Sequence, residues 1–433
     1  MMPAPGPAPG PVPTGEGHPV DPARRRRVDH LVGWFCAGYS AYFAQDAPPP
    51  NGLTQFMRYR LLLTKRRLQA RGVRLVPAFQ SRLSTAGTAP PPPMIAFDDG
   101  PFVYEFVFAK LVKLRQEWIT SDGGRTVHEQ KGTHHFALAS TGRGDGLYAC
   151  PQCGAVGPTE TLMAGCPYCH SQFKLEDFTE KVAACGRDKG GRWMSVDPAQ
   201  RGFSLALLVA VITMMVFALG GCAAFVALAL SGGGPSPALS WVAAAVFGGI
   251  AVALVAALPQ IVAALRRRSN RLRFEAAAKA ADGAFSLESL LESVDNKLAL
   301  IHLADSQQQV SAFAKCDLTS LLPTYQDVLD TEILDVTYGG YQADGAWVYA
   351  NLTATLELDV LQGKQVARRQ EKVRLTLGRL AHGPRRQAYD LVVFTCATCG
   401  APVELEQYGI CAHCGTPLAL EHHDWVITAY QPA

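Results

Sequence analysis

Two clusters of four cysteines constrain this chain more than any other feature of its sequence. Each cluster holds two Cys-x2-Cys pairs, separated by twelve residues in the first cluster and by eleven in the second. Each pair forms a tight turn that aims two thiolates at one point, and two pairs complete a tetrahedron. We therefore predict two structural Zn²⁺ sites with closed shells and no open position for a substrate. Their ligands are Cys150, Cys153, Cys166, Cys169, Cys396, Cys399, Cys411 and Cys414.

These two predicted sites define zinc ribbon 1, residues 146–185, and zinc ribbon 2, residues 396–430. Iron or a disulfide is the alternative at either cluster. The run from Cys166 to His170 also fits the Cys-x-x-Cys-His pattern of haem attachment, but haem would not account for Cys150 and Cys153. Zinc is the interpretation that uses every cysteine of both clusters.

Two apolar segments, 203–230 and 238–265, contain no charged residue over 28 residues each. About 20 apolar residues suffice to cross a bilayer, so both segments are long enough to span it with some tilt. Only the short uncharged turn 231–237 separates them. The pattern predicts a two-helix transmembrane hairpin over 203–265, with a buried pair of core helices as the alternative.

The charges beside the apolar segments predict their orientation. Four basic residues precede the first segment and five follow the second, whereas the turn between the segments has none. The positive-inside rule then places both termini in the cytoplasm and the chain in the cell (inner) membrane as a multi-pass protein. Eight metal-binding thiols also need a reducing compartment. The basic residues are Arg187, Lys189, Arg192, Arg201, Arg266, Arg267, Arg268, Arg271 and Arg273.

Charge is divided unevenly between the two parts of the chain, although the net formal charge is only +3. From residue 285 onward the chain has 10 Lys and Arg against 18 Asp and Glu, a net of −8. An acidic surface is a poor partner for phosphate backbones, so this balance disfavours nucleic-acid binding. The sequence gives no indication of an oligomeric state.

The N-terminal part contains a tail and a predicted folded region. Residues 1–23 are rich in Pro and Gly and predict a disordered tail. Residues 24–145 are interpreted as a helical or α+β domain, with amphipathic helices in 24–75 and a strand at 134–140. The stretch 102–119 fits a strand or a helix equally well. After ribbon 1, residues 173–184 are expected to be helical.

The C-terminal part changes from helical to strand periodicity. Residues 285–304 carry an apolar stripe at helical spacing, and a second helix is expected at 317–329 with Asp317 as its N-cap. Strict alternation from Val348 to Val360 predicts a long half-buried strand. Helices followed by an antiparallel meander predict an α+β fold with helices on one face of a curved sheet. Shorter strands are expected at 333–338, 373–377 and 389–395, and a helix at 273–284.

Residues 285–395 resemble the Tim forty-four-like domain, the membrane-docking domain of a mitochondrial import-motor subunit with many bacterial relatives. The resemblance implies a cone-shaped fold of the nuclear-transport-factor-two type, in which helices wrap a bent antiparallel sheet around a pocket. It also implies binding to lipid or protein surfaces. Residues 24–145 are a candidate degenerate copy of the same domain. The matching segments are Phe285–Leu291, Asp317–Leu329, Thr337–Leu377, the ribbon 2 cysteines and Asp424–Val426.

The sequence therefore predicts a membrane-anchored scaffold or adaptor rather than an enzyme. Its cone domain would bind a protein, a peptide or a lipid beside the cytoplasmic face of the membrane. The alternative is a hydrolase or isomerase acting in the cone pocket, because cone folds also host Asp–His or Asp–Tyr pairs. Candidate side chains for such a pair are His302, Asp305, Asp335 and Tyr338.

Overall fold

A computed structural model describes part of the 433-residue chain. The predicted hairpin at 203–265, the tail before residue 18 and, apart from Phe394, the expected strand at 389–395 lie outside the described residues. Among the residues that are described, no helix combines the length and the apolar character needed to cross a membrane. The described residues are 18–19, 22–81, 94–99, 104–120, 125–140, 147–150, 155–168, 170, 181–187, 266–267, 269–281, 285, 287–381, 394, 396, 398–399, 401, 403–422 and 424–433.

The chain divides into two compact units. One unit combines residues 1–193 with 274–433, and the other holds residues 194–273. The first unit contains mixed helices and antiparallel sheets, which confirms the predicted α+β class. The halves of this unit that precede and follow 194–273 are called the N-terminal half and the C-terminal half below.

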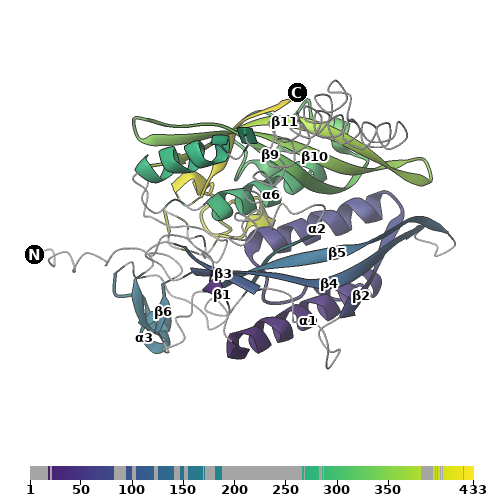
Figure 1. Cartoon of the computed structure of the whole chain (residues 1–433), viewed down its shortest axis with the longest axis horizontal. Helices are drawn as coiled ribbons and strands as arrows, with labels where there is room; N and C mark the ends of the chain where they lie inside the picture. The colour runs from purple at the N-terminus through teal and green to yellow at the C-terminus, as the bar shows by residue number, and fades with distance from the viewer. Residues whose placement is uncertain are drawn as a thin grey trace, which may run out of the picture. The chain divides into compact units, whose positions relative to one another are not determined.

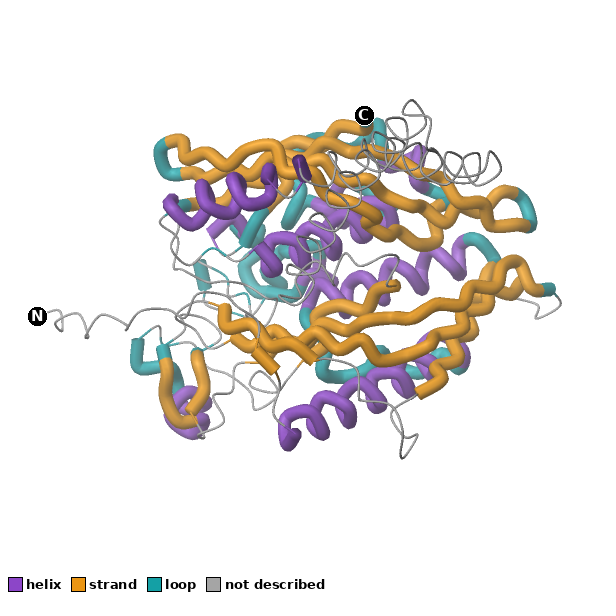
Figure 2. Tube along the Cα trace, viewed as in Figure 1, coloured by secondary structure: helices purple, strands orange, loops and turns teal. Residues whose placement is uncertain are grey.

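The C-terminal half is built on a four-stranded antiparallel sheet of order β12-β11-β10-β9. Strand β10 pairs with β11 along its whole length, from Trp347↔Leu380 to Gln362↔Gln365. Buried and half-buried side chains alternate along β10 up to Leu358, as the sequence predicted. Helix α6 covers the buried side (Figures 1 and 2). The elements are α6 (Leu287–Leu303), α7 (Gln307–Val310), β9 (Val328–Asp344), β10 (Trp347–Gln362), β11 (Gln365–Leu380) and β12 (Val426–Pro432).

The helix expected at 317–329 is wrong. The structure has turns there, then the 3-10 helix η3 (Leu322–Tyr325) and the start of β9 at Val328. Asp317 caps a local turn, because its Oδ1 accepts from the Thr319 N–H at 2.9 Å. Pro323 lies inside the segment and has no N–H to offer an α-helix. The helix expected at 273–284 is confirmed over 273–281.

The N-terminal half contains a six-stranded sheet around the long strand β4. Strands β3 and β2 pair with successive parts of β4, and β5 pairs with it from Glu105 to Ile119. The stretch 102–119, which fitted a strand or a helix, is a strand over its described part, 104–119. The helix expected at 173–184 is wrong where it is described, because β8 begins at Lys181. The strands are β1 (His18–Pro19), β2 (Val73–Ser81), β3 (Met94–Asp99), β4 (Tyr104–Thr120), β5 (Thr126–Ser140) and β8 (Lys181–Arg187).

Helix α2 (Gln55–Ala70) belongs to the cores of both halves, whereas α1 (Pro22–Ala44) packs in the N-terminal core only. Phe56, Tyr59 and Leu63 of α2 join the apolar cluster of α6 and the C-terminal sheet. Met57 and Leu61 join the cluster that contains α1 and the N-terminal sheet. Because two faces of one helix are buried in two cores, the halves form a single packed unit (Figure 1).

Candidate metal centre and buried polar network

Ribbon 2 brings its four cysteines together. Their sulfur atoms all lie within 4.8 Å of one another. Sγ of Cys396 is 3.4 Å from Sγ of Cys414, and Sγ of Cys399 is 3.5 Å from Sγ of Cys411. Zn–S bonds of about 2.3 Å in a tetrahedron separate sulfurs by about 3.8 Å, so these thiols fit one zinc ion after small adjustments. The structure thus confirms a possible four-cysteine metal site at the second cluster.

Backbone hydrogen bonds shape the two turns of this site in the same way. The N–H of the first cysteine of each pair donates to the carbonyl five residues later, from Cys396 to Ala401 at 2.8 Å and from Cys411 to Thr416 at 3.0 Å. Gly415 then adopts a left-handed conformation with φ +74°, and its N–H donates to the Cys411 carbonyl. Glycine suits this position because it has no Cβ to clash.

Local contacts also affect the ionisation of these thiols. The N–H of Cys399 lowers the pKa of Cys396 to about 6. A hydrogen bond to Thr416 lowers the pKa of Cys414. The Ala401 N–H favours the thiolate of Cys399 too, but neighbouring cysteines raise the pKa of Cys399 to about 12. Metal binding requires all four thiolates, and a divalent cation would displace the remaining protons.

Ribbon 1 is described in part. Cys153 and Cys169 lie outside the described residues, while Cys150 and Cys166 are buried like their counterparts in ribbon 2. The Cys150 N–H donates to the Ala155 carbonyl at 2.8 Å, again five residues later, and the His170 N–H donates to the Cys166 carbonyl at 2.8 Å. The hairpin β6 (Leu147–Ala149) and β7 (Val156–Pro158) carries the first pair, and the helix α3 (Thr159–Ala164) precedes the second.

His170 takes the place of Gly415 in this comparison. It has φ +58°, a left-handed conformation that side chains rarely adopt. The two ribbons therefore share the hydrogen bond that closes the first turn, the hydrogen bond to the first cysteine of the second pair, and a left-handed residue after that pair. The metal site of ribbon 1 itself stays a prediction.

His302 lies in the core of the C-terminal half. Its Nε2 is 2.9 Å from the Tyr430 hydroxyl and its Nδ1 is 3.1 Å from the Thr331 hydroxyl. Burial lowers its pKa to about 3, so the ring is neutral at physiological pH. Of the other candidates, Asp305 pairs with Arg67 and the Tyr338 ring packs against Phe274 at 5.2 Å.

The partners of His302 determine which ring nitrogen carries the proton. Tyr325 donates its single proton to the Glu371 carboxylate at 2.6 Å, so its oxygen accepts from Tyr430 at 3.0 Å. Tyr430 then accepts from His302 Nε2–H, and Nδ1 accepts from Thr331. The hydrogen bonds thus run in one direction from Thr331 to Glu371. Both ring nitrogens hold partners from the core, as expected of a structural histidine.

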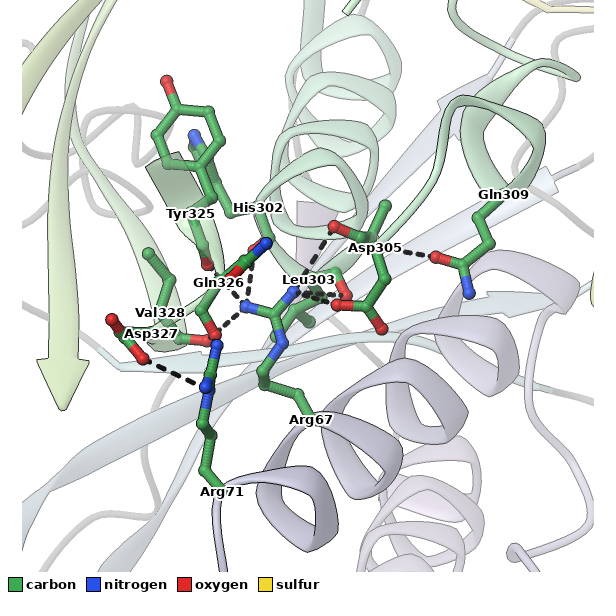
Figure 3. Close-up of polar contacts among 11 residues, drawn as sticks. Arg67, Arg71, His302, Leu303, Asp305, Gln309, Tyr325, Gln326, Asp327 and Val328 are labelled. Atoms are coloured by element: carbon green, nitrogen blue, oxygen red, sulfur yellow. Dashed lines mark hydrogen bonds and ion pairs between the residues drawn. The ribbon is translucent and has the colours of Figure 1, made fainter. Parts of the chain in front are cut away.

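Arg67 of α2 is the largest fully buried side chain in the described part of the chain, with 2 % exposure. Its guanidinium donates to carbonyls at the end of α6, at the end of η3 and at the start of β9, and to the Asp305 carboxylate at 3.0 Å (Figure 3). Such carbonyls at a helix end lack partners within the helix. The accepting carbonyls are those of His302, Leu303, Ala304, Tyr325 and Val328.

A second buried cation, Lys297 of α6, contacts Asp424 and Ser293. Its Nζ also lies 4.6 Å from the centre of the Phe56 ring. Asp424 follows the second cysteine pair of ribbon 2, so this ion pair joins the end of the ribbon to α6. Neither buried cation was predicted from the sequence. A usable signal existed for Arg67, because it follows Phe56, Tyr59 and Leu63 on one helical face.

No protein-family model, no curated protein and no solved structure matches this chain.

Proposed function

We propose that this protein is a membrane-anchored scaffold or adaptor on the cytoplasmic face of the cell (inner) membrane. Its α+β unit binds a protein, a peptide or a lipid, and it carries two structural zinc ribbons. The segment 194–273 contains the anchor, a two-helix hairpin at 203–265. The observation that carries the proposal is the single compact unit formed by the residues before and after this segment.

That shared unit bears directly on membrane topology. Arg67 in the N-terminal half donates to carbonyls in the C-terminal half, and α2 is buried against α6. Residues so packed must lie on one side of a membrane, because no bilayer can separate them. The chain between the halves must then leave and return on that side, which requires an even number of crossings. This supports a hairpin independently of the positive-inside rule, and that rule supports the cytoplasmic side.

The resemblance to Tim forty-four-like domains belongs to this proposal. Its support is the four-stranded antiparallel sheet of the C-terminal half with α6 on its buried side. The register between β9 and β10 also shifts at three points, and such bulges bend a sheet as the cone fold requires. The partners that fill both nitrogens of His302 favour binding over chemistry.

Reporter fusions at both ends of the chain test the topology. A cytoplasm-dependent reporter placed before Met1 and another after Ala433 should both be active, and a reporter that needs export should be silent at both sites. Activity on opposite sides would contradict the hairpin and the packed unit together. Crosslinking in native membranes would then identify the partner. The enzyme alternative takes precedence if His302→Ala removes biological activity while the protein still folds and captures that partner.

A further inference from the structure

The ribbon 2 loop, residues 403–410 between the two cysteine pairs, contacts the start of α2. Leu405 is buried in the apolar cluster that also contains Tyr59. The Leu405 N–H donates to the Gln55 Oε1 at 3.3 Å. The loop and the first turn of α2 therefore share both an apolar contact and a polar one.

An ion pair strengthens this contact. Arg58 Nε lies 2.5 Å from Glu406 Oε1, and the Glu406 side chain is only 26 % exposed. The loop then turns through Tyr408 and Gly409, both with left-handed φ angles of +61° and +67°. A Cβ on Gly409 would lie 2.6 Å from the Cβ of Ala312, so the loop packs closely against the C-terminal half.

The start of α2 is also paired to β8. The Thr54 N–H donates to the Val182 carbonyl at 3.2 Å, and the Val182 N–H donates to the Gly52 carbonyl at 2.9 Å. Strand β8 ends at Arg187, and the predicted membrane segment at 203–230 follows it in the sequence. The first turn of α2 thus connects ribbon 2 with the strand from which the chain continues to its proposed anchor.

We propose that metal binding by ribbon 2 regulates this junction. With Zn²⁺ bound, the ribbon 2 loop holds the start of α2 in place and, through it, β8. Without the metal, the two cysteine pairs lose their coordination bonds to a common ion, and the loop between them is released. This inference rests on the zinc site of the proposed function and adds a role for its occupancy.

The effect of releasing the ribbon 2 loop should be confined to the residues that it contacts. Arg67 holds the far end of α2 through carbonyls of α6, η3 and β9. The end of ribbon 2 is held by the Lys297–Asp424 ion pair and by the pairing of β12 with β11. Neither contact involves the ribbon 2 loop. Metal loss should therefore loosen the first turns of α2 and leave the last turn unchanged.

Hydrogen exchange of the full-length protein in detergent tests this gradient. In Cys399→Ser, amides of residues 58–63 and of β8 should exchange about tenfold faster than in the zinc-loaded protein, whereas residues 66–70 should be unchanged. Arg58→Ala should accelerate amide exchange of residues 58–63 while the zinc content stays at the wild-type value. Cys316→Ser replaces a cysteine outside both ribbons and is the matched control. It should change neither the amide exchange of these residues nor the zinc content.

Zinc content measured on the same samples separates a failure of the metal site from a failure of its regulatory role. If Cys399→Ser loses one zinc and exchange at 58–63 is unchanged, the regulatory role is overturned and the metal site stands. If the wild-type protein holds no zinc in ribbon 2, the metal site fails and the regulatory role fails with it. Loss of protection that extends to β10 would also overturn a local role, because ribbon 2 would then support the whole unit.

Discussion

Replacing Arg67 should destabilise both halves of the protein at once. The two Nη atoms carry four N–H groups between them but make six contacts, so several of these hydrogen bonds are shared. Arg67→Ala leaves buried carbonyls without donors, while Asp305, 58 % exposed, can return to water. Each buried carbonyl left without a donor costs about 1–3 kcal/mol, so the loss over several such carbonyls should be at least about 3 kcal/mol. That is a large fraction of the roughly 5–15 kcal/mol by which domains are stable.

Urea unfolding of the purified protein in detergent measures this loss. Tryptophan fluorescence reports on both halves, because Trp118 is buried in the N-terminal half and Trp425 in the C-terminal half. Arg67→Lys keeps the charge but not the planar fork, and should still cost about 2 kcal/mol. Arg66→Ala, an exposed neighbour on the same helix, is the control. An Arg67→Ala protein as stable as Arg66→Ala would refute the role assigned to the guanidinium.

Two further predictions concern the metal and pH. Metal analysis of the purified protein should give close to two zinc ions per chain, and Cys399→Ser should reduce this to about one; stoichiometric haem or no zinc at all would contradict the assignment. Burial lowers the pKa of His302 to about 3, below its usual value of about 6.5, so the unfolded state binds the proton first as pH falls. Stability from this group is therefore complete above pH about 6.5 and is lost toward pH 3, by up to about 1.4 kcal/mol per pH unit. A His302→Gln protein should show a flatter acid slope than wild type, and equal slopes would contradict the buried neutral ring.

Periodicity predicted the regular elements well where the pattern was long. The alternation from Val348 to Val360 lies within β10, and the apolar stripe from Leu287 to Ile301 lies within α6, which is slightly shorter than the expected helix at 285–304. Periodicity failed for short apolar runs: 181–184 fits a helix as readily as a strand, and the apolar residues of 317–329 lie in turns, the 3-10 helix η3 and the start of β9. Strand β12 was not predicted, because only its pairing with β11 identifies it.

The metal site was predictable because its ligands are close in sequence, and spacing alone places two turns toward one point. The buried cations were not, because their partners are distant. The helical spacing of Arg67 places it on the apolar face of α2 and distinguishes it from its exposed neighbour Arg66, but it does not identify the distant carbonyls that accept from Arg67. Lys297 meets Asp424 only in the folded chain. Whether a charge is buried depends on tertiary contacts, which one sequence does not contain.

Because the packing partners in this unit are far apart in the sequence, the chain has room for the proposed anchor between them. Helix α2 ends at Ala70, but its partner α6 begins at Leu287, after the 194–273 segment. Bringing distant residues together costs chain entropy, although each doubling of a loop adds only about 0.6 kcal/mol. On the proposed topology, a hairpin returns the chain to the membrane face that it left. It thereby holds both halves at one surface and raises their effective concentration for each other. The anchor would then favour the packing of α2 against α6 as well as fix the protein to the membrane.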